Sequence, residues 1–271
     1  MKLEVLMSCM HQNDDRLVEQ SGLTGDVVVI NQCDREAYRE YPTAKGVARM
    51  FSTTQRGLTR SRNMAIEKSN ADICLLCDDD ETFVADYEQK ICKAYQDIPQ
   101  ADIVIFKMLN RRRSFPDWVM RLRFPLTMRV SSWQISFRRE SIREAGIKFD
   151  ELMGAGTGNG AEEELKFLLD AQRAGLVIYY VPVPIASVAQ VQSTWFTGHN
   201  ETYFENRGAT TRYIMGAVLA VLYALYYTTC KWYIYGKSIT PHRALCATFR
   251  GIRENKITKQ AEAQKEEGLS K

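Results

Sequence analysis

This chain of 271 residues has little net charge, and it lacks a second cysteine or histidine pair that would complete a zinc site. The 36 Lys and Arg residues nearly balance 33 Asp and Glu, and the net charge of +3 is too small to indicate a nucleic-acid partner. Residues Met1–Glu4 lead into a short strand-like run without a long apolar segment, so we expect no signal peptide. The seven cysteines are scattered, which favours a reducing cytosol over a disulfide framework.

Cys74 and Cys77 have the spacing of a metal-binding C-x-x-C motif. They lie in an apolar run that we expect to be a strand, where side chains three residues apart point to opposite faces. Two such sulfurs could not bind one metal ion, and no second C-x-x-C or histidine pair completes a zinc site. We therefore predict that both are core cysteines.

The most informative motif in the chain is acidic. Asp78, Asp79 and Asp80 follow the apolar run Ile73–Cys77, which reads as a buried strand because it is short, apolar and bounded by charge. Open α/β sheets bind ligands at the carboxyl ends of their strands. Crowded carboxylates repel one another unless a cation lies among them, and hard divalent ions take oxygen ligands. A solvated acidic turn is the alternative, and the buried strand favours a metal site.

Strand and helix signals alternate through the first half of the chain. Strands are expected at 3–7, 27–30, 73–77 and 103–106, and helices at 14–21, 59–69 and 86–96. Thr59 or Ser61 is a suitable cap for the second of these helices. Strands separated by helices predict an α/β fold with a mostly parallel mixed sheet, Rossmann-like and flanked by helices.

In the second half, further strands are expected at 133–137 and 177–182. A glycine-rich loop at 154–160 leads into three acids and then into an amphipathic helix that ends at Gly175. This loop either brings backbone close to a ligand or is only a flexible connector. The basic, aromatic stretch 111–129 either meets lipid phosphate or is a solvated loop.

Residues Tyr213–Cys230 form an uncharged, largely apolar run bracketed by Arg212 and Lys231. A membrane span needs about 20 apolar residues, with a lower limit near 17. Tyrosines and a tryptophan around this run suit a membrane interface. We predict a helical, membrane-associated region that either lies on the membrane or crosses it once, with a buried helix as the alternative. The expected divisions are 1–200, 201–249 and a polar tail, 250–271, that is frayed.

Arg60 and Arg62 stand near the start of a predicted helix, after Gly57. An arginine at a helix N-terminus adds a bidentate contact to an end rich in free amide groups, which suits phosphate. Solvent exposure is the simpler explanation for Arg60. Arg62 is the stronger candidate because Asn63 and apolar residues follow it at once.

The order of these motifs resembles that of family 2 glycosyltransferases, which are inverting enzymes of the GT-A fold that use nucleotide-sugar donors. The resemblance rests on Gly57–Asn63, followed about ten residues later by Ile73–Asp80. It matches Asp78 and Asp80 to the two acids of the family's D-x-D motif. It therefore implies that these two residues bind Mg²⁺ or Mn²⁺, that Asp78 also contacts the donor, and that Asp79 is a spacer.

The acids after the glycine loop resemble the family's E-D segment, whose second acid is the catalytic base. That role transfers to Glu164, with Glu163 as the first acid of the pair. This chain has Glu in place of Asp and a third acid, Glu162, so the register among the three stays open. The resemblance also implies that the ends of the first two strands bind the nucleotide through Ser8, Asn31 and Asp34, and that Arg62 helps to place the diphosphate.

Residues 193–196 and 203–208 resemble a segment of bacterial members that build surface polysaccharides. The resemblance implies a metal-dependent hexosyl- or N-acetylhexosaminyltransferase at the cytoplasmic face of the cell membrane. Its donor would be a nucleotide-diphosphate sugar, expected to be uridine-linked, and its acceptor a glycan or a lipid-linked oligosaccharide. Two alternatives remain: a catalytically silent binding subunit of a membrane assembly, and a phosphatase. The phosphatase lacks support because Glu81-Thr82, not a D-G-T-like continuation, is present.

Overall fold

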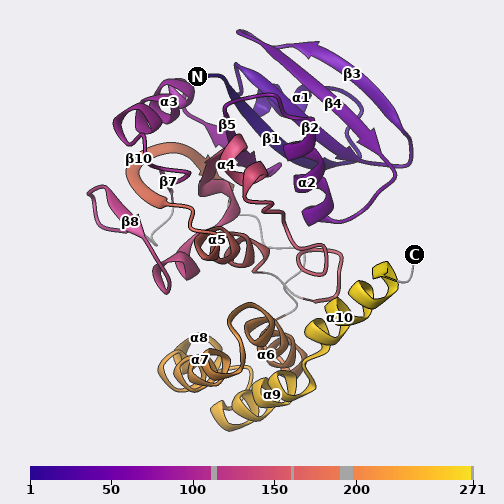
Figure 1. The fold of residues 1–271 in the computed structure, drawn as a ribbon, viewed down its shortest axis with the longest axis vertical. Helices are drawn as coiled ribbons and strands as arrows, with labels where there is room; N and C mark the ends of the chain where they lie inside the picture. Colours follow the sequence, from indigo (N-terminus) through magenta and orange to yellow (C-terminus); the bar gives the residue numbers. More distant parts are fainter. Residues whose placement is uncertain (111–114, 160–161, 190–197, 270–271) are drawn as a thin grey trace. The chain divides into compact units, whose positions relative to one another are not determined.

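A mixed β-sheet organises the first part of the chain in the computed structural model (Figure 1). The structure describes residues 1–110, 115–159, 162–189 and 198–269. Two compact units are present: Met1–Asp150 with Glu164–Val191, and Glu151–Glu163 with Gln192–Lys271. The first unit contains the sheet, and the second is helical.

The sheet has the strand order β3-β4-β2-β1-β5-β9-β7-β10-β6, and β8 pairs with β10. Its strands are β1 Leu3–Met10, β2 Asp26–Gln32, β3 Ala37–Pro42, β4 Val47–Thr53, β5 Ile73–Cys77, β6 Glu81–Phe83, β7 Ile103–Met108, β8 Met120–Leu122, β9 Ile135–Arg138 and β10 Ile178–Val188. Strands β4, β2, β1 and β5 are parallel neighbours, as are β7 and β10. The remaining pairs are antiparallel, so the expected α/β sheet is confirmed as mixed.

Strand β5 is buried on both faces, as its continuous apolar sequence predicts. Leu75 and Cys77 pack into one core cluster, whereas Cys74 and Leu76 pack into the other, on the opposite face. Burial raises the pKa of the Cys74 thiol to about 12, so this thiol stays protonated. The prediction of core cysteines is confirmed.

Helices cover the two faces of the sheet. The first unit contains α1 Arg16–Gln20, α2 Leu58–Lys68, α3 Tyr87–Asp97, α4 Arg139–Glu144 and α5 Glu163–Arg173, with 3₁₀ turns η1 Leu126–Arg129 and η2 Ser132–Gln134. On α3, Tyr87 and Ile91 bury their side chains in one core cluster. Ala65 of α2, Ile142 of α4 and Leu168 of α5 lie in the other cluster. The expected flanking helices are therefore present.

Two local features differ from the sequence expectations. Strands β3 and β4 occupy a stretch expected to be a loop; β3 is mostly exposed and has no apolar run that would have revealed it. Helix α2 is capped by Gly57, whose φ of +121° favours glycine, and not by Thr59 or Ser61. Both of those residues lie within the first turn of the helix.

The second unit contains α6 Glu201–Met215, α7 Ala217–Cys230, α8 Trp232–Tyr235, α9 Pro241–Glu254 and α10 Lys256–Leu269 (Figure 1). Helices α6 and α9 make close backbone contact at two glycines. An added Cβ at Gly208 would clash with the Thr248 carbonyl oxygen, and one at Gly251 would clash with that of Glu205. The two glycines therefore permit the close packing of this helix pair.

The apolar run 213–230 is divided between α6 and α7 at Gly216, whose φ is +82°. In the part of the chain that the structure describes, no helix is both long and apolar enough to cross a membrane. The polar tail, expected to be frayed, is instead helical through Leu269. Ile252 and Ile257 are buried, so the helices at this end have apolar contacts. The polar composition of the tail gave no sign of them.

Candidate active site

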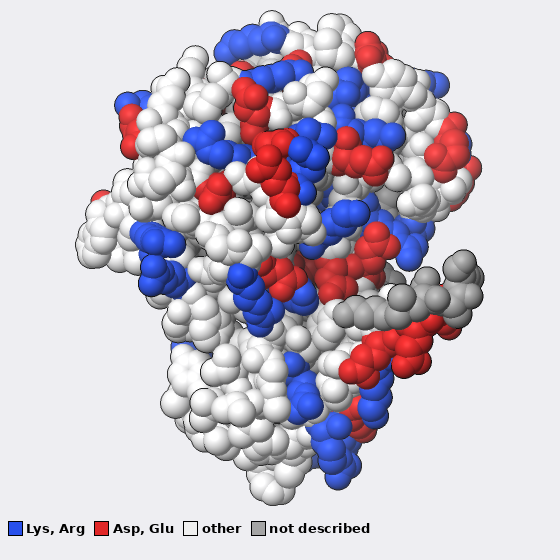
Figure 2. Space-filling view, viewed as in Figure 1, with Lys and Arg blue, Asp and Glu red and all other residues white. Residues whose placement is uncertain are grey.

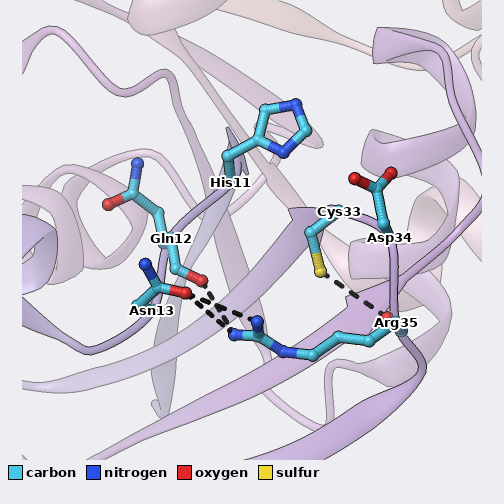
Figure 3. A pocket seen from close by; sticks show the side chains of 6 residues that line it. All are labelled: His11, Gln12, Asn13, Cys33, Asp34 and Arg35. Atoms are coloured by element: carbon cyan, nitrogen blue, oxygen red, sulfur yellow. Dashed lines mark hydrogen bonds between the residues drawn. The ribbon is translucent and has the colours of Figure 1, made fainter.

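The carboxyl ends of β2, β1 and β5 lie together at one edge of the sheet because these strands are parallel neighbours. The segments that follow β1 and β2 line a pocket of about 370 Å³ (Figure 3). Its lining residues are His11, Gln12, Asn13, Cys33, Asp34 and Arg35. This is the edge where open α/β sheets bind ligands, and the volume lies within the range of small-molecule sites.

Asn31 holds one wall of this pocket in place from within the protein. Its side chain is fully buried, its Oδ1 accepts from the Gln12 backbone N–H at 2.9 Å, and its Nδ2 donates to the Gln12 carbonyl oxygen at 2.8 Å. The Arg35 guanidinium contacts the same carbonyl at 3.3 Å and Asn13 Oδ1 at 3.4 Å (Figure 3). The pocket wall is therefore preorganised by hydrogen bonds.

The three residues predicted to contact a nucleotide lie in different places. Ser8 is buried on β1, and its hydroxyl accepts from Ser61 Oγ at 2.9 Å, which joins β1 to α2. Asn31 lies behind the pocket wall, whereas Asp34 lines the pocket itself. Asp34 also pairs with Arg56 at 2.5 Å. Of the three, only Asp34 is among the lining residues.

Arg62 brings together two acids that are far apart in the sequence. Its side chain is 2% exposed, and its Nη2 donates to Asp78 Oδ1 at 3.0 Å. Its Nη1 lies 3.5 Å from Glu164 Oε1. The guanidinium carbon also lies 5.4 Å from the centroid of the Phe149 ring, and Ser132 Oγ donates to Asp78 Oδ2 at 2.8 Å. Asp78 and the predicted base thus belong to one network around the buried guanidinium of Arg62.

The turn after β5 is held by Glu81, a residue that we did not single out from the sequence. Its buried carboxyl group accepts the Asp78 backbone N–H through Oε1 at 2.7 Å. Burial, reinforced by the Asp78 carboxylate, raises the pKa of Glu81 well above its ordinary value. Within the same turn, Asp79 is exposed and Asp80 is half-buried.

The three consecutive glutamates have different surroundings. Glu162 has a φ of +85° and forms an ion pair with Arg207 at 3.4 Å. Glu163 is buried, and Glu164 is paired with Arg62. The structure links Glu164 to Asp78 through a shared partner, Arg62.

Whether a divalent cation fits at the turn after β5 depends on how many ligands the protein side chains supply there. Among the described residues, no three His, Cys, Asp or Glu side chains are arranged to hold a metal ion. Mg²⁺ commonly binds one or two carboxylates and completes its shell with water and substrate phosphates. Asp78 already accepts from Arg62 and Ser132, so a cation bound to this carboxylate would share it with these two donors. Two carboxylates at this turn fit a cation that binds together with a diphosphate.

Sequence reasoning missed Gln12, Arg35 and Ser132 as parts of the site. Gln12 and Arg35 each follow the end of a parallel strand, and that position is a signal that could have identified them. Ser132 carries no comparable signal, because its contact with Asp78 depends on how η2 packs beside β5.

Comparison with solved structures defines the class of fold. S. aureus TarS 1-349 matches at 15% identity with a TM-score of 0.51, covering 83% of this chain and 66% of that one. The structures of the same fragment with UDP-GlcNAc and with UDP match at TM-scores of 0.56 and 0.53, both at 16% identity, covering 83% and 78% of this chain and 67% and 65% of theirs. At these identities the likeness is one of fold, a GT-A-like mixed α/β sheet with flanking helices. This chain spans just under two thirds of the first of these fragments.

The family follows from the sequence itself. The model of glycosyl transferase family 2 matches residues 11–159, more than half of the 271 residues. The chain belongs to this family, as its ordered motifs predict. No curated protein sequence gives a significant match.

Proposed function

We propose that this protein is an inverting glycosyltransferase that moves a sugar from a nucleotide-diphosphate donor to an acceptor hydroxyl. The observation that carries the proposal is the Arg62 network, which connects Asp78 of the D-x-D motif to Glu164. Asp78 directly follows β5, and the pocket follows the neighbouring strands β1 and β2. The pocket that would bind the donor and the acid Asp78 therefore lie at the same edge of the sheet.

A uridine-linked donor is the proposed substrate class. Family membership supports a nucleotide sugar, and the TarS fragment of similar fold has been solved with UDP-GlcNAc and with UDP. The nucleotide would lie in the pocket beside Asp34, with the walls fixed by the Asn31 and Arg35 hydrogen bonds. The diphosphate would extend toward the turn after β5, where Asp78 and Asp80 would hold Mg²⁺ or Mn²⁺. Such an ion offsets the charge that develops on the diphosphate as it leaves.

Glu164 would act as the general base. As the acceptor oxygen attacks the anomeric carbon, its proton passes to the Glu164 carboxylate and the bond from that carbon to the diphosphate oxygen breaks. The nucleoside diphosphate departs with the bonding electron pair, and attack from the opposite face inverts the anomeric configuration. The ion pair with Arg62 orients the carboxylate for this step.

The acceptor proposed is a glycan or a lipid-linked oligosaccharide of surface polysaccharide synthesis. Residues 203–208 support this through their resemblance to bacterial members of that group. The companion segment 193–196 lies outside the described residues.

Replacing the base separates catalysis from binding. Glu164→Gln should lower the turnover rate by about 10²–10⁴-fold, the usual contribution of general base catalysis, while donor affinity changes little. The matched control is Glu162→Gln, because Glu162 pairs with Arg207 and not with Arg62. Normal turnover in Glu164→Gln, with turnover lost in the control, would move the base to Glu162 and reject the assignment.

A further inference from the structure

The helical unit carries an exposed apolar surface on α7 and α8. Its main side chains are Val218, Leu222, Leu225, Tyr226, Trp232 and Tyr233, which are between 42% and 74% exposed. We call these residues the apolar docking surface. Figure 2 shows few charged side chains over this part of the helical unit. We propose that the apolar docking surface inserts into the interface of a bilayer that contains anionic phospholipids.

Helix α7 divides into a packed face and an exposed face. Ala220, Ala224 and Thr228 recur at intervals of four residues and are buried. The first two belong to a small core cluster with Ile252 of α9. The larger apolar residues of the docking surface therefore point away from the core, although a soluble helix would place polar side chains there. Exposed apolar surfaces of this kind mark interaction sites.

The length of α7 fits a position along the interface. Its 14 residues span about 21 Å, shorter than the roughly 30 Å hydrocarbon core of a bilayer. The helix starts after the break at Gly216 and ends before Lys231. Trp232 and Tyr233 follow directly, and aromatic residues of this type favour the headgroup level. A helix with one apolar face and aromatic neighbours matches interfacial binding.

Positive charge near the apolar docking surface favours an anionic partner. The sequence contains no Asp or Glu between Glu205 and Glu254, and it has seven Lys and Arg residues in that interval. Arg207, Arg243 and Arg250 form ion pairs with Glu162, Glu201 and Glu205, so the positive charge offered to a partner comes from Arg212, Lys231, Lys237 and Arg253. Lys231 lies within the docking surface itself, with its Nζ 5.8 Å from the Tyr226 ring centroid and 5.7 Å from that of Tyr233. Anionic lipid headgroups attract lysines held at this level.

The same lysine argues against a second copy of this chain as the occupant. A two-fold dimer places the same patch of each copy against the other. Lys231 would then meet a like-charged patch in an apolar contact, where no acid of α7 or α8 is present to pair with it. A bilayer lets the lysine extend its charged end to the headgroups while its neighbours stay in apolar surroundings.

Vesicle flotation tests the proposal with the full-length purified chain. The protein should float with phosphatidylcholine vesicles that contain about one-third phosphatidylglycerol, and much less with phosphatidylcholine alone. Leu222→Ser combined with Leu225→Ser should weaken binding about tenfold or more, because two exposed apolar side chains lose their contact with lipid. Lys231→Gln combined with Lys237→Gln should remove the preference for anionic vesicles without removing apolar residues, and it gives an independent reading if the leucine variant does not fold.

Two exposed leucines supply a matched control. Leu222 is 57% exposed within the docking surface, and Leu109 is 58% exposed in the first unit. Leu222→Ser should weaken vesicle binding, whereas Leu109→Ser should not. The proposal is overturned if the wild-type chain floats with neither vesicle, if the double leucine variant folds and binds as the wild type does, or if Leu109→Ser weakens binding and Leu222→Ser does not. It is also overturned if sedimentation shows a wild-type dimer that Leu222→Ser converts to monomer. These readouts do not involve turnover, so they fail or succeed separately from the proposed function.

Discussion

Arg62 and Asp78 form an ion pair beside the turn that follows β5, with Nη2 at 3.0 Å from Oδ1, and the arginine side chain is 2% exposed whereas that of Asp78 is 24% exposed. The guanidinium is thus already engaged by the protein, and Glu164 and the Phe149 ring lie beside it. Its first physical role is to hold the two acids in a fixed relation. A contact between Arg62 and a donor diphosphate remains a prediction.

Replacement of Arg62 tests this organising role through stability. Arg62→Gln leaves the partly exposed Asp78 and Glu164 carboxylates without their shared cation. Because hydrogen bonds to charged groups contribute about 1.5–3 kcal/mol, we expect the free energy of unfolding to fall by about that amount. Arg60→Gln, at an exposed position of the same helix, should change stability by no more than about 0.5 kcal/mol. Denaturant unfolding of both variants is the measurement. Equal stability of the two would mean that the network is not part of the folded structure in solution.

Asp80 is the acid that we expect to ligate the metal most directly. Titration of Mn²⁺ against donor binding should show metal-dependent affinity in the wild type, and Asp80→Asn should lose that dependence because a neutral amide is a poor ligand for a hard cation. Asp79→Asn, the exposed neighbour in the same turn, should keep it. Unchanged metal dependence in Asp80→Asn would contradict the assignment.

Glu81 should make stability depend on pH in a direction opposite to that of most carboxylates. Burial and the Asp78 carboxylate raise the pKa of Glu81 in the folded protein. As the pH rises through about 4.5, the unfolded chain therefore loses the Glu81 proton while the folded protein keeps it. The contribution of Glu81 to the free energy of unfolding consequently decreases as the pH rises above that value. The stability of Glu81→Gln relative to wild type should therefore improve as the pH rises from about 5 to 8.

An exposed acid supplies the control of opposite sign. The hydrogen bond from Arg143 lowers the pKa of Glu140 on α4, so its contribution is present at neutral pH and is lost on acidification. Glu140→Gln should lose a little stability at neutral pH and none in acid, because solvent screens this pair. Unfolding curves at several pH values distinguish the two cases, and the same trend in both variants would refute the account of Glu81.

Gly251 tests the packing of the helical unit. Gly251→Ala would place a methyl group against the Glu205 carbonyl oxygen of α6, which the helix pair accommodates only by moving apart. We expect a loss of about 1–3 kcal/mol, typical of overpacking, whereas Cys246→Ala at an exposed position of α9 should cost little. Thermal unfolding measures both, and no loss for Gly251→Ala would show that α6 and α9 do not pack so closely.

Much of the sheet was predictable because its inner strands are apolar on both faces. The runs that became β2, β5 and β7 are apolar in sequence, and each is buried in the structure. Strand β3 was not predictable, because an edge strand with exposed residues needs no apolar pattern. The break at Gly216 was also missed, since an apolar composition does not reveal where a helix changes direction.

The candidate site was predictable where motifs fix residues locally and unpredictable where tertiary contacts decide their role. Asp78 and Glu164 were predicted as site residues from motif order, and the structure connects them through Arg62. The inward orientation of Asn31 depends on hydrogen bonds to a backbone 19 residues away along the chain. Ser132 likewise reaches Asp78 across 54 residues, and no local pattern encodes that contact.

Release of nucleoside diphosphate from a panel of nucleotide sugars tests the central claim most directly. With Mg²⁺ or Mn²⁺ present, the wild-type protein should release nucleoside diphosphate from at least one uridine-linked donor, with water or an added glycan as the acceptor. Glu164→Gln should bind the same donor and release almost none. Failure of the wild-type protein to release nucleoside diphosphate from any donor, or equal release by Glu164→Gln, would contradict the account.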